Sequence, residues 1–182
     1  MRIVLVFPPQ GHFTQPYLSL PSLAAYLRHN GCDDVHLIDA SIEAYDHFLT
    51  RTRLARAIER IGAPAELARL EGLEELRFSQ MERYQLLTEI DLAGDDVLTG
   101  VEEAKRVLRT PTEFYDYERY LWAGRTIEQA LRIVSAEYAP SRLTAHGFVM
   151  QNRVERSREI LAAADDARAN PFVEYFQSET MG

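Results

Sequence analysis

The sequence predicts an α/β protein with two parallel strands and a large, mainly helical remainder. The first observation is the run RIVLVF at residues 2–7, whose β-branched and aromatic side chains are typical of a strand buried on both faces of a parallel sheet. The second is a set of leucines and alanines at helical spacing over residues 18–27. The third is another apolar run, VHLI at residues 35–38. Strand, helix and strand in this order predict parallel pairing through a right-handed crossover, which makes a partial Rossmann-like βαβ unit.

Local signals predict where these elements end. The pair Pro8-Pro9 ends the first strand, and Pro21 fits the first turn of the helix, where its missing N–H costs nothing. Gly31 follows as a helix stop, and Asp39 closes the second strand.

Beyond the second strand, apolar residues keep helical spacing over most of the chain. We predict that Gly62 with Pro64 breaks this series, that a turn lies at residues 94–96, and that a new helix begins after Gly100. Two further helical stretches are predicted around Gly124. Apolar stripes of this kind are typical of a protein core rather than of a cofactor site.

The carboxyl-terminal part has a mixed pattern. Residues 142–150 indicate a third strand or an extended segment, and helical patterns follow at residues 154–164 and 171–176, the last capped by Asn170. We therefore predict a single domain over residues 1–182. Its parts are a βαβ unit at residues 1–40, a helical insertion at residues 41–138, and an extended segment with C-terminal helices at residues 139–182.

Two strands are few for a doubly wound sheet, which usually has four or more. Either the helical segments cover the βαβ unit, or strands from another chain complete its sheet. The second alternative implies an obligate partner or self-association, because an uncovered sheet edge is a template for pairing.

The composition limits the classes of function. No apolar stretch reaches the roughly 18 residues of a membrane span, and the start is too short for a signal peptide, so we expect a cytoplasmic protein. With 20 basic against 28 acidic residues, the net charge of −8 disfavours nucleic acid and membrane partners. Cys32 is the only cysteine, so this chain alone supplies no disulfide, thiolate zinc site or iron–sulfur cluster.

The candidate binding site is the carboxyl edge of the predicted sheet, where open α/β sheets bind ligands. Asp39 lies at this edge, where it would either hold a ligand hydroxyl or cap the next helix. The loop after the first strand is either a ligand loop or a plain connection stiffened by prolines; its candidate residues are Pro9, Gln10, Gly11, His12, Phe13 and Thr14. The loop has no dinucleotide or P-loop fingerprint, and we assign no catalytic residue and no metal ligand in the chain.

A second cluster gathers aromatic and basic side chains. Four aromatic residues stand close to Arg119 and Arg125 in the sequence, a combination that suggests base stacking; they are Tyr115, Tyr117, Tyr120 and Trp122. The negative net charge opposes this function, and amphipathic packing is the simpler explanation of the aromatic residues.

The segment VFPPQGHFTQPYLSLPSLAAYLRHNGCDDVHLIDASIEAYDHFL at residues 6–49 resembles the amino-terminal segment of cobalamin-binding (B12-binding) radical SAM proteins. In that family a strand ending in Pro-Pro leads to a P-x-L-S-L-P-S-L-A-A-x-L helix. The segments LRIVSAEYAPSRLT (131–144) and ANPFVEYFQSE (169–179) are similar to pieces that follow a helical insertion in the family.

The resemblance implies a Rossmann-like cobalamin domain, which in the family precedes a barrel whose C-x-x-x-C-x-x-C motif holds a [4Fe–4S] cluster and SAM. Many members methylate unactivated carbons or phosphorus in natural-product pathways. The present chain lacks the cysteine motif and ends at Gly182, where the remaining strands of the domain would begin. Where many cobalamin domains have D-x-H-x-x-G, this chain has Gly11-His12-Phe13-Thr14, so His12 as a lower axial ligand and binding without a histidine both stay open.

The resemblance therefore implies an accessory subunit that helps to form or shield the cobalamin site of a radical SAM enzyme in a protein complex. Cobalamin would be shared with the partner, which is a radical SAM polypeptide or another chain that completes the sheet; a homo-oligomer is the other arrangement. Two alternatives remain: a non-catalytic scaffold that has lost cofactor binding, and a stand-alone enzyme.

Overall fold

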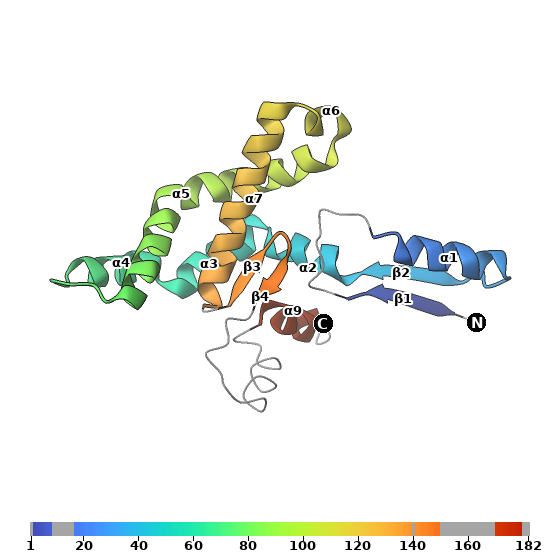
Figure 1. Ribbon diagram of the computed structural model, residues 1–182, viewed down its shortest axis with the longest axis horizontal. Helices are drawn as coiled ribbons and strands as arrows, with labels where there is room; N and C mark the ends of the chain where they lie inside the picture. Colours follow the sequence, from blue (N-terminus) through green and yellow to red (C-terminus); the bar gives the residue numbers. More distant parts are fainter. Residues whose placement is uncertain (1, 9–16, 140, 150–169, 180–182) are drawn as a thin grey trace.

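A computed structural model describes residues 2–8, 17–139, 141–149 and 170–179. Within these ranges the chain is mainly helical and contains two small two-stranded sheets (Figure 1). In the same part of the chain, no helix combines the length and the apolar character needed to cross a membrane.

The amino-terminal βαβ unit follows the predicted order of strand, helix and strand. Its elements are β1 (Ile3–Phe7), α1 (Ser19–His29) and β2 (Val35–Asp39). The two strands pair in parallel, with Ile3 opposite Val35 and Phe7 opposite Asp39, and α1 packs against both strands. The turn after α1 uses Gly31, whose φ of 83° lies in the left-handed region that favours glycine. The predicted parallel pair is confirmed.

One face of this sheet is uncovered by the described residues. Val4 is 49% exposed and Val6 is 54% exposed, whereas Ile3, Leu5 and Phe7, which alternate with them, are partly buried. The prediction of a strand buried on both faces is therefore wrong for this part of the chain. The physical reason is that α1 covers part of the other side, where Leu37 is still 42% exposed, and no described element seals the side of Val4 and Val6.

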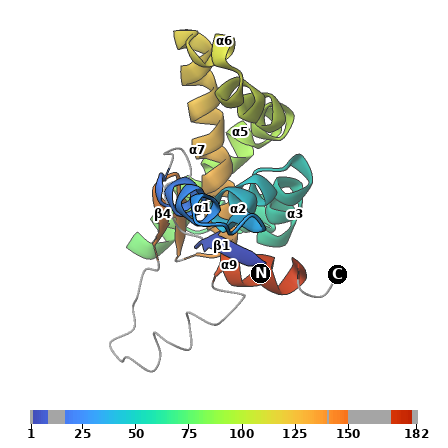
Figure 2. The same ribbon diagram turned by 90° about the vertical axis from the view of Figure 1, so that its right-hand side faces the viewer.

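The helical body follows β2 without a loop. Its helices are α2 (Ala40–Phe48), α3 (Arg51–Ile61), α4 (Ala63–Glu71), α5 (Phe78–Arg109), α6 (Pro111–Phe114) and α7 (Tyr117–Glu137). Gly62 ends α3 with a left-handed φ of 60°, as predicted. Helices α5 and α7 make the most extensive contact of the body and run together to α6, which lies at the far end of this arm in both Figure 1 and Figure 2.

Three predicted interruptions of these helices are absent from the structure. Helix α5 continues through the expected turn at residues 94–96 and through Gly100, and α7 continues through Gly124. A Cβ on Gly100 would lie 3.1 Å from Cζ2 of Trp122, so this glycine lets α5 and α7 approach closely. At Gly100, packing between the helices therefore outweighs the local helix-breaking tendency of glycine.

The carboxyl-terminal part contributes a hairpin and one helix. Strands β3 (Arg142–Thr144) and β4 (Gly147–Val149) pair antiparallel in their own sheet, so the extended segment predicted at residues 142–150 does not join the β1–β2 pair. Asn170 caps α9 (Pro171–Glu179) as predicted, because its Oδ1 accepts the backbone N–H of Phe172 at 3.0 Å. The helix predicted at residues 154–164 lies outside the described residues.

The core lies inside the helical body. It is formed by side chains of α2, α3, α4, α5 and α7, closed by β3 and α9. The largest fully buried members include Tyr45, Phe48, Leu87, Leu131 and Phe172. The aromatic rings of Phe48 and Phe172 meet edge to face at 5.3 Å between centroids, which attaches α9 to α2.

Candidate functional site

The carboxyl edge of the β1–β2 pair carries the one predicted site residue that the structure describes, Asp39. Phe7 and Asp39 are the last paired residues of the two strands, so both lie at this edge. Tyr17 stacks on Phe7 with 4.3 Å between ring centroids. Phe7, where β1 ends, and Tyr17, just before α1, therefore lie together at this edge, with Asp39 beside Phe7.

The other predicted site residues lie between Phe7 and Tyr17 in the sequence. Pro9, Gln10, Gly11, His12, Phe13 and Thr14 lie outside the described residues. Their assignment to the site therefore stays a prediction.

Asp39 has a structural function in the fold. Its Oδ1 accepts the backbone N–H of Ser41 at 3.1 Å and that of Ile42 at 3.0 Å, which caps the first turn of α2. Capping, one of the two roles expected for Asp39, is confirmed. A carboxylate has about four acceptor positions, so two hydrogen bonds on one oxygen leave acceptor capacity for a ligand hydroxyl.

Helix α2 fixes this edge to the helical body. Ser41 and Ala44 are buried, and the hydroxyl of Tyr45 donates to the backbone carbonyl of Thr144 at 2.7 Å. Burial raises the pKa of Tyr45, which keeps the hydroxyl neutral and able to donate. The position of Asp39 thus depends on α2 being held against β3.

The side of the sheet away from α1 presents an apolar surface, which we call the open sheet face. Paired positions of parallel strands lie side by side and alternate residues point to the same side, so Val4, Val6 and Ile38 share this face. All three side chains are exposed, with His36 beside them. Such a surface is typical of a place where another element packs.

A buried ionic cluster joins α3, α7 and α9. Arg53 is 6% exposed and donates to Oε2 of Glu137 at 2.6 Å and to the hydroxyl of Tyr138 at 2.7 Å. Arg60 pairs with Glu137 at 2.7 Å and with Glu174 at 3.0 Å, and the hydroxyl of Tyr138 donates to Glu174. Every charge of this cluster has an opposite partner, which favours a structural role over catalysis.

The pKa shifts of the cluster agree with that role. Burial and the carboxylate of Glu174 raise the pKa of Tyr138. Burial acts to raise the pKa of Glu174, but hydrogen bonds from Tyr138 and Arg60 outweigh it and lower the pKa. The tyrosine therefore stays neutral and the carboxylate stays ionised at neutral pH.

This cluster was not predicted from the sequence. A signal is nevertheless present, because Arg53, Ala57 and Arg60 stand at helical spacing on one side of α3 and Ala57 is fully buried. Arginines on the apolar side of a helix predict buried carboxylate partners, although the sequence does not identify them.

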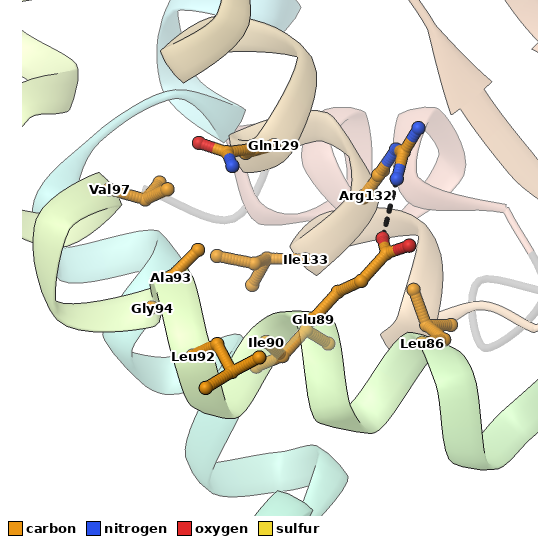
Figure 3. A pocket seen from close by; sticks show the side chains of 10 residues that line it. All are labelled: Leu86, Glu89, Ile90, Leu92, Ala93, Gly94, Val97, Gln129, Arg132 and Ile133. Carbon is orange, nitrogen blue, oxygen red and sulfur yellow. Dashed lines mark hydrogen bonds and ion pairs between the residues drawn. The ribbon is translucent and has the colours of Figure 1, made fainter.

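A cleft of about 230 Å³ lies between α5 and α7 (Figure 3). Apolar side chains make most of its lining, among them Leu86, Ile90 and Ile133. Its two charged lining residues, Glu89 and Arg132, pair with each other across the helices. The cleft therefore offers apolar contact and one neutralised ion pair, not an acid and a base set up for catalysis.

Within the described ranges, no group of three or more histidine, cysteine, aspartate or glutamate side chains is arranged to hold a metal ion. No family model, curated protein or solved structure matches the chain.

Proposed function

We propose that this chain is an accessory subunit that contributes part of a Rossmann-like cobalamin-binding domain. Its partner would be a cobalamin-dependent radical SAM enzyme, a methyltransferase or a related enzyme that modifies natural products. The chain would help to form or shield the cobalamin site, and the radical chemistry would belong to the partner. The open sheet face is the observation that carries this proposal.

A parallel pair of strands with one face that the described residues leave uncovered is a poor unit by itself. Parallel sheets are usually covered on both faces and usually have more than two strands. Burying the exposed parts of Val4, Val6 and Ile38 under a partner would contribute to binding at roughly 25 cal/mol per Å² of apolar surface. A partner that adds strands and covers this face supplies what the sheet needs.

The carboxyl edge supports cobalamin as the ligand only together with the resemblance. Ligands of open α/β sheets bind outside the carboxyl ends of the strands, where Phe7, Tyr17 and Asp39 meet. The sequence between Phe7 and Tyr17 contains the PPQGHFT segment. In the family that the chain resembles, the corresponding loop lies at the cobalamin edge of the sheet. Asp39 would then accept a hydrogen bond from the bound cofactor while it still caps α2.

Copurification tests the association. The chain is coexpressed with a candidate radical SAM polypeptide and purified through a tag on one partner. The product is incubated with hydroxocobalamin before its visible spectrum is recorded. We expect a complex that retains the corrinoid absorption bands after gel filtration. Absence of both the complex and the bound corrinoid contradicts the proposal.

Two matched variants locate the interface. Val6→Lys places a charge on the open sheet face and should reduce recovery of the complex at least tenfold. Leu92→Lys places the same charge at an aliphatic residue of α5 that is 78% exposed and should leave recovery unchanged. Equal recovery of both variants would show that the partner binds elsewhere.

Variants of Asp39 separate capping from cofactor binding. Asp39→Asn keeps an acceptor for the N–H groups of Ser41 and Ile42 and should preserve stability, but it should weaken cobalamin retention. Asp39→Ala should also cost about 1 kcal/mol of folding free energy. His12→Ala, compared with these variants by visible spectroscopy, tests whether a histidine ligates the cobalt.

A non-catalytic scaffold is the second candidate, favoured by the capping bonds that already occupy Asp39. A scaffold would form the complex, and its cobalamin content would be the same in the wild type, the Asp39→Asn variant and the His12→Ala variant. The spectrum of the Asp39→Asn complex therefore decides between the two functions.

A further inference from the structure

The arm formed by α5, α6 and α7 ends far from the β1–β2 sheet (Figures 1 and 2). Exposed aromatic side chains lie at this end of the arm. We call this surface the aromatic tip and define it by Phe114, Tyr115, Tyr117 and Tyr120. Tyr115 is 84% exposed and Tyr117 is 70% exposed. Amphipathic packing, the explanation expected from the sequence, therefore does not account for these two rings.

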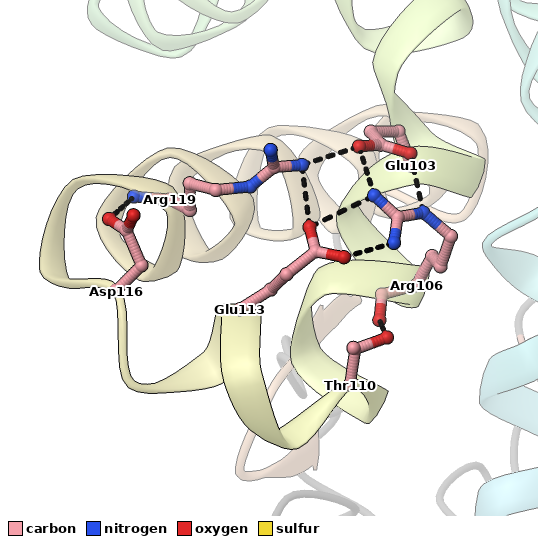
Figure 4. Close-up of polar contacts among 6 residues, drawn as sticks. All are labelled: Glu103, Arg106, Thr110, Glu113, Asp116 and Arg119. Atoms are coloured by element: carbon pink, nitrogen blue, oxygen red, sulfur yellow. Dashed lines mark hydrogen bonds and ion pairs between the residues drawn. The ribbon is translucent and has the colours of Figure 1, made fainter.

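An ionic network holds the aromatic tip in place (Figure 4). Arg106 of α5 forms ion pairs with Glu103 and Glu113, and Arg119 of α7 pairs with the same two carboxylates at 2.6 and 2.7 Å. Asp116 caps α7 by accepting the backbone N–H of Arg119 at 3.2 Å. Hydrogen bonds from Arg106 lower the pKa of Glu103 and of Glu113, so both stay ionised at neutral pH.

Three rings of the tip, those of Phe114, Tyr115 and Tyr120, are in contact with one another through Phe114. Phe114 meets Tyr115 at 5.4 Å and Tyr120 at 5.2 Å between centroids, both edge to face. Phe114 ends α6, Tyr115 follows it, and Tyr117 and Tyr120 lie on α7. The ion pairs of Glu113 with Arg106 and Arg119 fix α6 to both long helices, so these rings stand on an ordered support. A preorganised surface loses less conformational entropy on binding than a mobile loop does.

The charge around the tip selects the kind of partner. The elements of the tip carry four carboxylates, of which two are paired with the two guanidinium groups of the network; the four are those of Glu103, Glu113, Asp116 and Glu118. Glu118 is exposed and forms no ion pair with the described residues. The surface therefore has excess negative charge next to tyrosine faces, which attract cations.

We propose that the aromatic tip binds an arginine-containing peptide segment of a partner protein. An arginine side chain stacks on a tyrosine ring and forms an ion pair with a carboxylate at the same time, and tyrosine and arginine are enriched where interfaces are strongest. The phosphates of a nucleic acid would be repelled by the same carboxylates, although its bases stack well on aromatic rings. This binding would occur without cobalamin and without the enzyme that completes the β1–β2 sheet.

Fluorescence anisotropy on the full chain tests this proposal with a labelled peptide of alternating glycine and arginine. We expect Tyr115→Ala/Tyr117→Ala to bind this peptide about tenfold more weakly than the wild type. Tyr26→Ala is the matched control, because Tyr26 lies on α1 with a similar exposure of 67%, and it should bind as the wild type does. Glu118→Gln should weaken binding by about threefold and reduce its dependence on salt.

Each other outcome overturns the proposal. Equal affinity of the wild type and the tyrosine double variant would mean that the peptide responds only to the net charge of −8. Tighter binding of a single-stranded oligonucleotide would identify a base-stacking surface. Assembly of copies that is lost in the double variant, measured by analytical ultracentrifugation, would identify a self-association surface. Circular dichroism of the variants confirms that the fold is retained.

Discussion

The helical body and the βαβ unit use similar apolar residues in opposite ways. In the body, Phe48 and Leu131 are buried among α2, α7 and α9. In the βαβ unit, Val4 and Val6 leave about half of their surface in solvent. The body thus encloses a core of its own, whereas the βαβ unit has an apolar face that the described residues do not cover. The apolar pattern of a sequence identifies a surface that packs against something. It does not say whether the same chain or a partner supplies the surface that covers it.

Ion pairs also differ between regions of the molecule in how far they are buried. Arg53 and Glu137 form a buried pair with further hydrogen bonds to Arg60 and Tyr138. Glu89 and Arg132 form an exposed pair at the rim of the α5–α7 cleft. Removing one member of a buried pair leaves the other charge with neither solvent nor an opposite charge around it. Breaking the buried pair should therefore reduce the stability much more than breaking the exposed pair does.

The largest expected effect comes from Phe48→Ala in the body. Removing this buried ring should cost about 3–5 kcal/mol of unfolding free energy, because the cavity between Tyr45, Phe172 and Tyr175 cannot close fully. Urea unfolding measures the loss. Leu23→Ala on the exposed side of α1 is the control and should cost less than about 1 kcal/mol. Similar losses for both variants would contradict the contrast between the two regions.

The next effect comes from Glu137→Gln in the buried ionic cluster. We expect a loss of about 3 kcal/mol, because the buried guanidinium of Arg53 loses its charged partner. Glu89→Gln breaks the exposed pair with Arg132 and should cost less than about 1 kcal/mol. Urea unfolding of both variants would sharpen the comparison, and a smaller loss for Glu137→Gln than for Glu89→Gln would refute it.

A smaller effect on stability is expected from Glu174, and it depends on pH. The pKa of Glu174 is lower in the folded chain than in the unfolded chain, so its ionised form stabilises the fold above the unfolded pKa of about 4.3. This stabilisation should disappear as the pH falls through the lower folded pKa. The stability difference between wild type and Glu174→Gln, measured from pH 7 downward, should therefore shrink in acid.

Tyr138→Phe provides the control for that titration, because it removes the hydroxyl that donates to Glu174. In the Tyr138→Phe background, Glu174→Gln should produce a smaller difference at neutral pH. An unchanged difference would show that Tyr138 does not contribute to the lowered pKa.

The smallest expected effect is that of Val6→Lys on the stability of the isolated chain. A charged side chain on the open sheet face stays in solvent, so the change should be within about 0.5 kcal/mol. Val134→Lys places the same charge in the core and should unfold the chain. A large loss for Val6→Lys in urea unfolding would mean that the open sheet face is covered in the isolated chain.

The elements of the βαβ unit could be predicted because their signals are local. An apolar run, proline at its end and Gly31 after a helical pattern specify strand, turn and helix within a few residues of one another. The capping role of Asp39 could also be expected, because the side chain needs only the N–H groups of the next turn. Within the candidate site, the positions of residues 9–14 remain predictions from the sequence.

Contacts between distant residues escaped the sequence reasoning. The continuity of α5 through Gly100 depends on Trp122 in α7, and the burial of Arg53 depends on Glu137 and Tyr138. Periodicity identifies an apolar stripe on each helix and contains no information on which helices meet.

The sequence by itself determined the parallel pair, the capped helix that follows it and the mainly helical remainder, because these depend on residues close along the chain. Only the tertiary structure decided that the described residues leave one face of the pair open, that Arg53 and Arg60 of α3 are neutralised and that the tyrosines at the end of the arm face solvent. Burial depends on what packs against a residue, and that is a property of the assembled elements rather than of any one of them.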